Sequence, residues 1–237
     1  MTAKRNKSLI KSLAFRILYP LSERYLSRER SYRYKDINIT VFPGVFHPGF
    51  YFSTKLLLKY LEGIDLNKKY VLELGAGTGL ISIYAAKKGG FVTASDISLT
   101  AFYNIEKNTK MNDSNVEVVH SDMFEQVPQL RYDYIIINPP YYKKTPTTQK
   151  EFAWFGGDDF QYFRKLFSQL GNFYFENTNV IMILSDEAEI EMIKSIAAEY
   201  KFLMTEIFQK KIWGEEHFIF NIRSITITSD ERFNTSL

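Results

Sequence analysis

The residues best suited to chemistry stand in four short groups, each directly after an apolar run. The groups are Gly75, Gly77 and Gly79; Asp96 and Ile97; Asp122 and Met123; and Asn138-Pro139-Pro140-Tyr141. Carboxylate and amide oxygens accept hydrogen bonds, and glycine lets a ligand approach the backbone closely. Ligands of open α/β sheets bind outside the carboxyl ends of the strands. If each apolar run is a parallel strand, the four groups meet at one edge and form a single small-molecule site.

The first group joins a strand with the apolar residues Val71, Leu72 and Leu74 to a helical pattern that begins at Leu80. Such a turn presents free N–H groups of the helix to a ligand. Its Gly-x-Gly-x-Gly spacing is one residue shorter than the Gly-x-Gly-x-x-Gly fingerprint of dinucleotide sites. Glu73 stands just before the turn, where a carboxylate suits an amino-acid ammonium better than a pyrophosphate. A turn that only packs a helix on a strand, without a ligand, stays open as the alternative.

The pattern Glu73-x-Gly75-x-Gly77-x-Gly79 resembles the first motif of the class I S-adenosylmethionine-dependent methyltransferases. The resemblance implies that S-adenosylmethionine is the cofactor and that these four residues contribute to its binding site. The glycine spacing disfavours a nicotinamide cofactor.

The next two strand ends complete the predicted cofactor site. Asp96 follows the second strand, and a carboxylate there can accept hydrogen bonds from both ribose hydroxyls, with Ile97 beside it. Asp122 follows the third strand and can accept a hydrogen bond from the adenine amine, while Met123 can pack on the ring. An acidic residue at any one strand end is weak evidence, but the ordered set indicates an adenosyl-amino-acid site, to which Asn138 also contributes.

The segment Asn138-Pro139-Pro140-Tyr141 resembles the catalytic motif of methyltransferases that act on planar nitrogens. Such a nitrogen is a poor nucleophile because its lone pair is conjugated. Acceptors such as the Asn138 amide oxygen and the Pro139 carbonyl can localise that lone pair, and the prolines restrict the backbone that presents the carbonyl. Tyr141 offers a face for stacking a flat amide or base. No metal, general-base histidine or covalent nucleophile is required.

A later segment gives a narrower indication of the acceptor. Residues 155–159, Phe-Gly-Gly-Asp-Asp, resemble the Gly-Gly-x-Asp-Gly segment of the glutamine methyltransferases that modify peptide-chain release factors. Phe160 departs from that family, which continues with Gly-Leu. Residues 142–154 are predicted to form a mobile lid over the substrate.

From Tyr70 onward, strand and helix patterns alternate, which indicates a doubly wound α/β fold. The expected strands are residues 70–74, 91–95, 116–120, 132–137, 180–184, 202–209 and 217–227, with helices at about 79–88, 98–111, 158–170 and 187–199. The resemblance implies the Rossmann-like methyltransferase topology: seven strands, mostly parallel, with the last strand an antiparallel hairpin partner of its predecessor.

The N-terminal region differs from the rest in charge. Residues 1–40 contain ten Lys and Arg against three acidic residues, whereas the remaining chain has a charge of −4 and the total is +3. Residues 1–34 are predicted to form two helical pieces split near Pro20. We therefore divide the chain into a basic helical arm, residues 1–36, and a methyltransferase domain, residues 37–237. The arm either packs on the body or contacts nucleic acid, the ribosome or a membrane surface.

The loop at residues 43–54 is rich in aromatic and turn residues. It is expected either to cover the cofactor and substrate or to plug the space under the sheet. Ser53 or Thr54 is predicted to cap the following helix. His47 is expected to be packed or hydrogen-bonded, because no second metal ligand stands near it.

The leading interpretation is an S-adenosylmethionine-dependent N-methyltransferase acting on a protein glutamine amide or an exocyclic amine of RNA or DNA. The substrate would be a release-factor-like protein or a nucleic acid, with a ribosome-associated partner favoured by the arm. A non-catalytic RNA- or ribosome-binding protein on the same fold is the alternative. The chain contains no cysteine, which excludes thiolate chemistry and fits the cytoplasm. No apolar run reaches the length of a membrane span.

Overall fold

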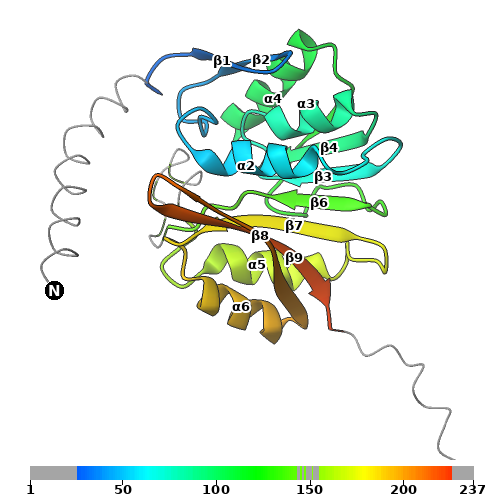
Figure 1. Cartoon of the computed structure of the whole chain (residues 1–237). Coiled ribbons are helices and arrows are strands. Elements are labelled where there is room, and N and C mark those ends of the chain that lie inside the picture. Colours follow the sequence, from blue (N-terminus) through cyan, green and yellow to red (C-terminus); the bar gives the residue numbers. More distant parts are fainter. Residues whose placement is uncertain (1–25, 143–144, 146, 148–150, 152–154, 226–237) are drawn as a thin grey trace, which may run out of the picture.

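The computed structural model describes residues 26–142, 145, 147, 151 and 155–225. Its centre is a seven-stranded sheet in the order β5-β4-β3-β6-β7-β9-β8 (Figure 1). The strands are β3 (Tyr70–Leu74), β4 (Phe91–Asp96), β5 (Val116–His120), β6 (Tyr134–Ile137), β7 (Asn179–Ser185), β8 (Phe202–Ile212) and β9 (Glu215–Ser224). Within this sheet, β9 runs antiparallel to both of its neighbours, and the other pairings are parallel. The predicted mostly parallel sheet and its C-terminal hairpin are confirmed.

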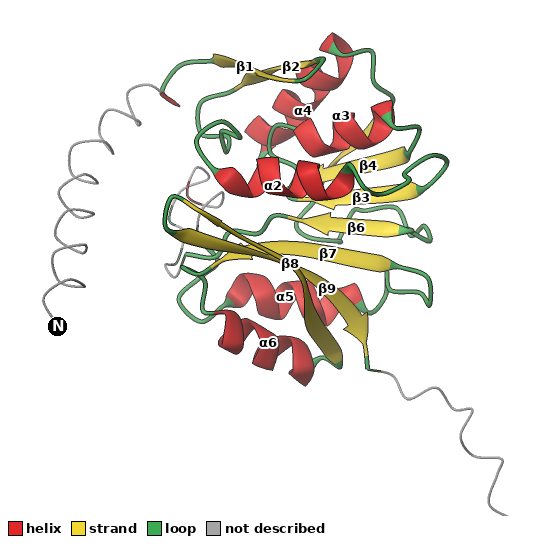
Figure 2. Cartoon of the chain, in the orientation of Figure 1, coloured by secondary structure: helices red, strands yellow, loops and turns green. Residues whose placement is uncertain are grey.

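Helices cover both faces of the sheet (Figure 2). One face carries α2 (Phe52–Leu61), α3 (Leu80–Lys87) and α4 (Leu99–Met111), and the other carries α5 (Gln161–Leu170) and α6 (Ile190–Glu199). Successive residues of a strand point to opposite faces, so Val71 enters the core beneath α2 and α3 while Leu72 enters the core with α5 and α6. Burial on both faces explains why β3, β6 and β7 are almost continuously apolar.

A separate hairpin precedes the sheet. Strands β1 (Arg30–Tyr34) and β2 (Ile37–Val41) pair antiparallel, so the prediction of helix up to residue 34 is wrong for β1. The alternation of Ile37, Ile39 and Val41 buries one face of β2, and Tyr32 and Tyr34 of β1 pack beside the same core. Pairing with β2 decides the conformation of β1, which contains too few apolar residues to specify it alone. The predicted helical pieces in residues 1–25 lie outside the described residues.

Helix α2 begins at Phe52, before both of the residues predicted to cap it, Ser53 and Thr54. Tyr51 is the N-cap residue and makes no side-chain capping bond, so the assignment of Ser53 or Thr54 as the cap is wrong. Both lie in the first turn of α2 and are buried. The Thr54 hydroxyl accepts a hydrogen bond from Asn138 instead of capping its own helix. Among the described residues, no helix combines the length and apolarity needed to cross a bilayer.

Candidate active site

The glycine turn lies between β3 and α3 and is anchored to β4. The N–H groups of Gly75 and Ala76 both donate to the Ser95 carbonyl, at 2.9 Å each. Gly79 has a φ of 72°, and a Cβ at this position would stand 2.9 Å from Ile105 of α4. A side chain at Gly79 would therefore meet both an unfavourable backbone region and the packed face of α4. A Cβ at Gly75 would meet no protein atom within 4 Å, so this glycine leaves open space at the site.

Asp96, at the end of β4, binds the turn from the other side. One carboxylate oxygen accepts from the Gly77 N–H at 2.9 Å, and the other accepts from the Ser98 N–H at 2.9 Å. Burial raises the pKa of Asp96, while these backbone hydrogen bonds act in the opposite direction. A carboxylate has about four acceptor sites, so Asp96 can still accept from a ligand. The residue lines the cavity, as predicted for a ribose-binding acid.

Glu73 lies deeper, with only 5% of its surface exposed. Its Oε2 accepts from the Ser82 N–H at 2.7 Å and from the Ser82 hydroxyl, which joins it to the first turn of α3. Burial raises the pKa of Glu73 to about 8, although the bonds from Ser82 oppose the shift. Burial therefore favours the protonated, neutral form of this carboxyl. Glu73 also lines the cavity, so its predicted contact with a cationic ligand group remains geometrically open.

The strand end after β5 differs from the simple prediction. Asp122 lines the cavity, but Lys165 of α5 lies 2.7 Å from its carboxylate. The same ammonium lies 2.5 Å from Glu125. The sequence did not identify Lys165, because Lys165 and Asp122 lie on separate elements and no sequence pattern relates them. Met123 also lines the cavity and has a φ of 55°.

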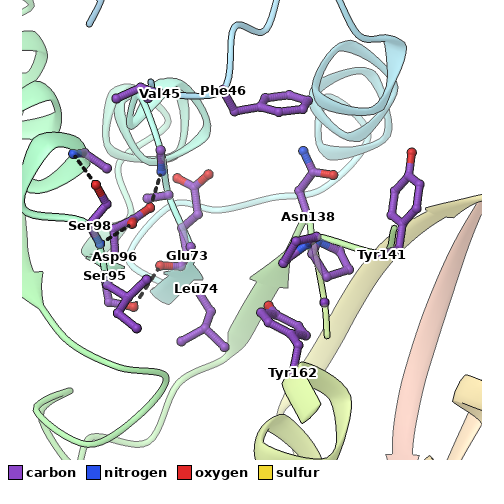
Figure 3. Close-up of a pocket in the computed structure, with 18 of the residues that line it drawn as sticks. Val45, Phe46, Glu73, Leu74, Ser95, Asp96, Ser98, Asn138, Tyr141 and Tyr162 are labelled. Carbon is purple, nitrogen blue, oxygen red and sulfur yellow. Dashed lines mark hydrogen bonds between the residues drawn. The ribbon is translucent and has the colours of Figure 1, made fainter. Parts of the chain in front are cut away.

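One cavity of about 460 Å³ joins these groups to the Asn-Pro-Pro-Tyr segment. All the predicted site residues except Gly79 line it. Gly79 packs towards Ile105 of α4 instead. The lining residues among those predicted are Glu73, Gly75, Gly77, Asp96, Ile97, Asp122, Met123, Asn138, Pro139, Pro140 and Tyr141. Figure 3 shows Glu73 and Asp96 on one side of this cavity and Asn138 and Tyr141 on the other. The cavity therefore has one half shaped by the glycine turn and another shaped by the Asn-Pro-Pro-Tyr segment.

Asn138 points into the space between Phe46 and Tyr141 (Figure 3). Its Nδ2 donates to the Thr54 hydroxyl at 3.4 Å, which orients the amide. Its Oδ1 has no hydrogen-bond partner among the described residues. The amide is thus held by its donor end and presents an acceptor to the cavity.

Gly156 of the Gly-Gly segment packs against the Asn-Pro-Pro-Tyr segment. A Cβ on Gly156 would stand 2.7 Å from the Pro140 carbonyl oxygen, so only glycine fits this approach without a shift of the backbone. The Gly156 N–H donates to the Tyr142 carbonyl at 3.0 Å, and the Gly156 carbonyl accepts from the Tyr162 N–H at 3.0 Å. Gly157, with a φ of 92°, continues the turn into α5. The two sequence motifs therefore form one structural unit.

The aromatic loop covers the cavity. Phe46 and Tyr51 both line it, and their ring centroids lie 4.7 Å apart. His47 is buried and does not line the cavity: its Nδ1 accepts from the Gly49 N–H at 3.0 Å, and its ring makes edge contacts with Tyr32 and Phe50. The expectation that His47 is packed is confirmed, and the covering role of the loop is favoured over the plug. Within the described part of the chain, no group of three acidic or histidine residues could bind a metal ion.

Several lining residues were not assigned from the sequence. They include Thr54, Ser98, Tyr162 and Lys165. Tyr162 lies on the buried side of α5, and burial together with the charge of Asp96 raises its pKa. The helical spacing of Tyr162 in the sequence predicts only that it packs against the core, so the sequence alone could not assign it to the site. The predicted lid falls mostly on residues 143–154, of which only 145, 147 and 151 are described.

Comparison with known proteins gives concordant results. The family model described as the methyltransferase small domain matches residues 36–154, half of the chain. A putative protein N5-glutamine methyltransferase of Methanocaldococcus jannaschii is 39% identical over 133 residues, covering 53% of this chain and 64% of that protein. A ribosomal RNA small subunit methyltransferase C of Actinobacillus pleuropneumoniae is 34% identical over 126 residues, covering 51% of this chain and 37% of that protein.

Solved structures show the same fold. The T. thermophilus 16S rRNA N2 G1207 methyltransferase, in complex with AdoMet and guanosine, superimposes with a TM-score of 0.60 at 19% identity, covering 83% of this chain and 50% of that chain. The present chain spans less than two thirds of the length of the relatives it matches. The matched segment nevertheless contains the glycine turn, Asp96, Asp122 and Asn138. The chain belongs to the methyltransferase small domain family.

Proposed function

We propose that this protein is an S-adenosylmethionine-dependent N-methyltransferase that acts on a planar nitrogen. The observation that carries the proposal is Asn138, whose Oδ1 has no hydrogen-bond partner in the described part of the chain and which lines the same cavity as the glycine turn and Asp96. The methyl acceptor is a protein glutamine amide or an exocyclic amine of a nucleic-acid base. Two relatives, one named for a protein glutamine and the other for ribosomal RNA, support this pair of classes.

The residues present fit the cofactor. Gly75 leaves space that a Cβ would fill, and Asp96 keeps acceptor capacity for hydroxyl groups. Glu73 supplies a carboxyl group in the same half of the cavity for an ammonium group. The bound cofactor supplies a methyl group on a sulfonium, which is already activated for transfer.

The chain then has to bind and orient the acceptor. Asn138 Oδ1 and the Pro139 carbonyl are the acceptors we assign to the N–H groups of the planar nitrogen, which favours a localised lone pair. Tyr141 provides a stacking face, and Thr54 holds the Asn138 amide so that its oxygen is presented. Phe46 and Tyr51 cover the cavity and limit access of water. Positioning of this kind accounts for a large part of the rate of such transfers.

Isothermal titration calorimetry tests the cofactor site. The Asp96→Ala variant loses two charge-assisted hydrogen bonds of about 1.5–3 kcal/mol each, so its affinity for S-adenosylmethionine should fall tenfold or more. Asp65→Ala is a matched control, because it removes an exposed carboxylate that does not line the cavity. Tighter binding of NADH than of S-adenosylmethionine by the native chain would contradict the proposal.

Incubation with methyl-labelled S-adenosylmethionine and a cell extract tests the transfer. Label should enter either protease-sensitive or ribonuclease-sensitive material, which identifies the class of acceptor. Cofactor binding without transfer of label to either class would instead support a non-catalytic binding protein on this fold.

A further inference from the structure

The tip of the β8–β9 hairpin carries an unusual residue. Ile212 pairs with Glu215, so Trp213 and Gly214 form a two-residue loop. Both have positive φ, 53° and 91°, which is the pattern of a type I′ turn. Asn, Asp and Gly favour the first central position of this turn, whereas a bulky side chain with positive φ is disfavoured. Trp213 is also 96% exposed. Neither backbone preference nor burial explains tryptophan here, and strained residues of this kind cluster at functional sites.

The tip lies beside the acceptor half of the cavity. The Trp213 ring centroid is 6.2 Å from that of Phe52, which opens α2 directly after the cavity-covering loop. Burial raises the pKa values of Tyr141 and Tyr142, which both line the cavity, and the negative charge of Glu215, on the other strand of the hairpin, adds to both shifts. Figure 1 shows the hairpin tip next to the start of α2. A polymer that inserts one side chain or base into the cavity would therefore pass close to Trp213.

The charges near the tip are mixed in sign. Lys211 is paired with Glu216 at 3.0 Å, and Glu215 lies 3.7 Å from the Nε2 of the buried His217. Lys210 has no ion-pair partner among the described residues. In the cavity, Lys165 is paired with Asp122 and Glu125. Lys55 of α2 lies 6.0 Å from the Phe52 ring centroid. The described rim therefore mixes lysines with carboxylates instead of forming a uniformly positive surface along a phosphate backbone, and its exposed tryptophan is typical of a protein–protein contact.

We propose that Trp213, supported by Phe52, is the docking residue for a protein substrate. Its indole packs on the substrate segment that flanks the side chain entering the cavity. This inference rests on the proposed methyltransferase function and assigns the acceptor to the protein class. Trp213 does not contact the reacting atoms, so its contribution is to substrate affinity.

The test uses the full chain, methyl-labelled S-adenosylmethionine and an untreated cell extract, whose labelled products are then sorted into protease-sensitive and ribonuclease-sensitive material. In Trp213→Asn, a residue suited to positive φ replaces the tryptophan, so the melting temperature should stay constant or rise by about 2–4 °C. At limiting extract, label transfer to protein should fall at least tenfold, while the affinity for S-adenosylmethionine stays unchanged. Trp213→Phe should retain most of the transfer. Leu203→Thr, on β8 and 55% exposed, is the control for removal of an exposed apolar side chain.

The outcomes separate the two proposals. Equal transfer by Trp213→Asn and the native chain overturns the docking role and leaves the methyltransferase function standing. Label that enters only ribonuclease-sensitive material overturns the protein assignment in favour of nucleic acid. Absence of any transfer by the native chain overturns the proposed function and this inference with it.

Discussion

At the scale of single residues, Asn138 and Thr54 form the pair that prepares the site. The Thr54 hydroxyl accepts from Asn138 Nδ2, so the amide orientation follows from the hydrogen bond. A free asparagine side chain could present either its donor or its acceptor, and only the acceptor is useful toward an N–H group. The threonine on α2 therefore assists the residue after β6, across a separation of 84 positions.

Asn138→Ala should reduce turnover about a hundredfold or more, because it removes one preorganised acceptor of the transition state. S-adenosylmethionine affinity should change little, since we assign the glycine turn and Asp96 most of that binding. Single-turnover methyl transfer and calorimetry measure the two effects separately. Asn172→Ala, which alters an exposed residue outside the cavity, is the control. Wild-type turnover, or loss of cofactor binding alone, would contradict the catalytic assignment.

Glu73 makes stability depend on pH in an unusual direction. Its folded pKa of about 8 lies above the usual value of 4.5, so the folded state binds the proton more tightly than the unfolded state. The contribution of the protonated Glu73 to the free energy of unfolding is complete below pH 4.5 and is lost as the pH rises toward 8. At about 1.4 kcal/mol per pKa unit, the loss is on the order of 5 kcal/mol.

Glu73→Gln, which mimics the neutral acid, should remove this dependence. Urea unfolding at pH 5 and pH 8 should show similar stabilities for the variant and native chains at pH 5, and greater stability of the variant at pH 8. Glu117→Gln, on an exposed position of β5, is the control. A native chain that loses no stability relative to Glu73→Gln between these pH values would argue against a protonated Glu73.

At the scale of elements, α4 holds the β1–β2 hairpin through three asparagines spaced four residues apart. Asn108 and Asn112, the latter the C-cap residue of α4, accept from the β2 N–H groups of Thr40 and Asn38, and Asn104 accepts from the N–H of Phe42, directly after β2. All three side chains donate to a β2 carbonyl. The amides thus bond to β2 much as another strand would. Because β2 leads directly into the cavity-covering loop, this contact also positions the loop.

Asn108→Ala should destabilise the protein by roughly 2–4 kcal/mol, because Asn108 is buried and its loss leaves the Thr40 N–H and the Thr78 carbonyl without this partner. Misplacement of the covering loop should also weaken S-adenosylmethionine binding. Urea unfolding and calorimetry measure both effects. Asn115→Ala, in the exposed loop after α4, should be near neutral. Equal stability of the two variants would show that the asparagine contacts contribute little.

At the scale of the whole molecule, the β1–β2 hairpin lies across the predicted boundary at residue 36 between the basic arm and the body. Residues 30–41 form the β1–β2 hairpin, and Lys107 of α4 pairs with Glu29 at 2.9 Å. Residues 1–25 contain six Lys and Arg against a single acidic residue, so much of the excess positive charge precedes the described part. A truncation that tests the arm should therefore end at residue 25 and leave the hairpin intact.

Deletion of residues 1–25 should leave the melting temperature and cofactor affinity close to those of the full chain if the arm serves an anionic partner. The salt dependence of binding to RNA or ribosomes should become flatter, because each neutralised phosphate releases counterions. Filter binding over a range of salt concentrations measures the slope. A large fall in melting temperature would show instead that the arm packs on the body.

The sequence alone determined the alternation of strands and helices and the order of the motifs. Both are local properties: residues 71–72, 135–137 and 180–184 are apolar because these strands are buried on two faces, and the glycine turn is required by its own backbone. Each predicted strand from β3 to β9 is present, with ends that differ by up to three residues. Strand order required the family resemblance, because periodicity carries no information about neighbours in a sheet.

The tertiary structure decided the contacts between distant segments. Thr54 with Asn138, Lys165 with Asp122, Gly156 against Pro140, and the strand conformation of Arg30–Tyr34 all depend on the packing of separate elements. Spacing along the chain specifies the face on which a residue lies, but not the partner that packing brings to it. For this reason the sequence indicated most of the side chains that line the cavity, whereas the folded chain determined which of their atoms face it.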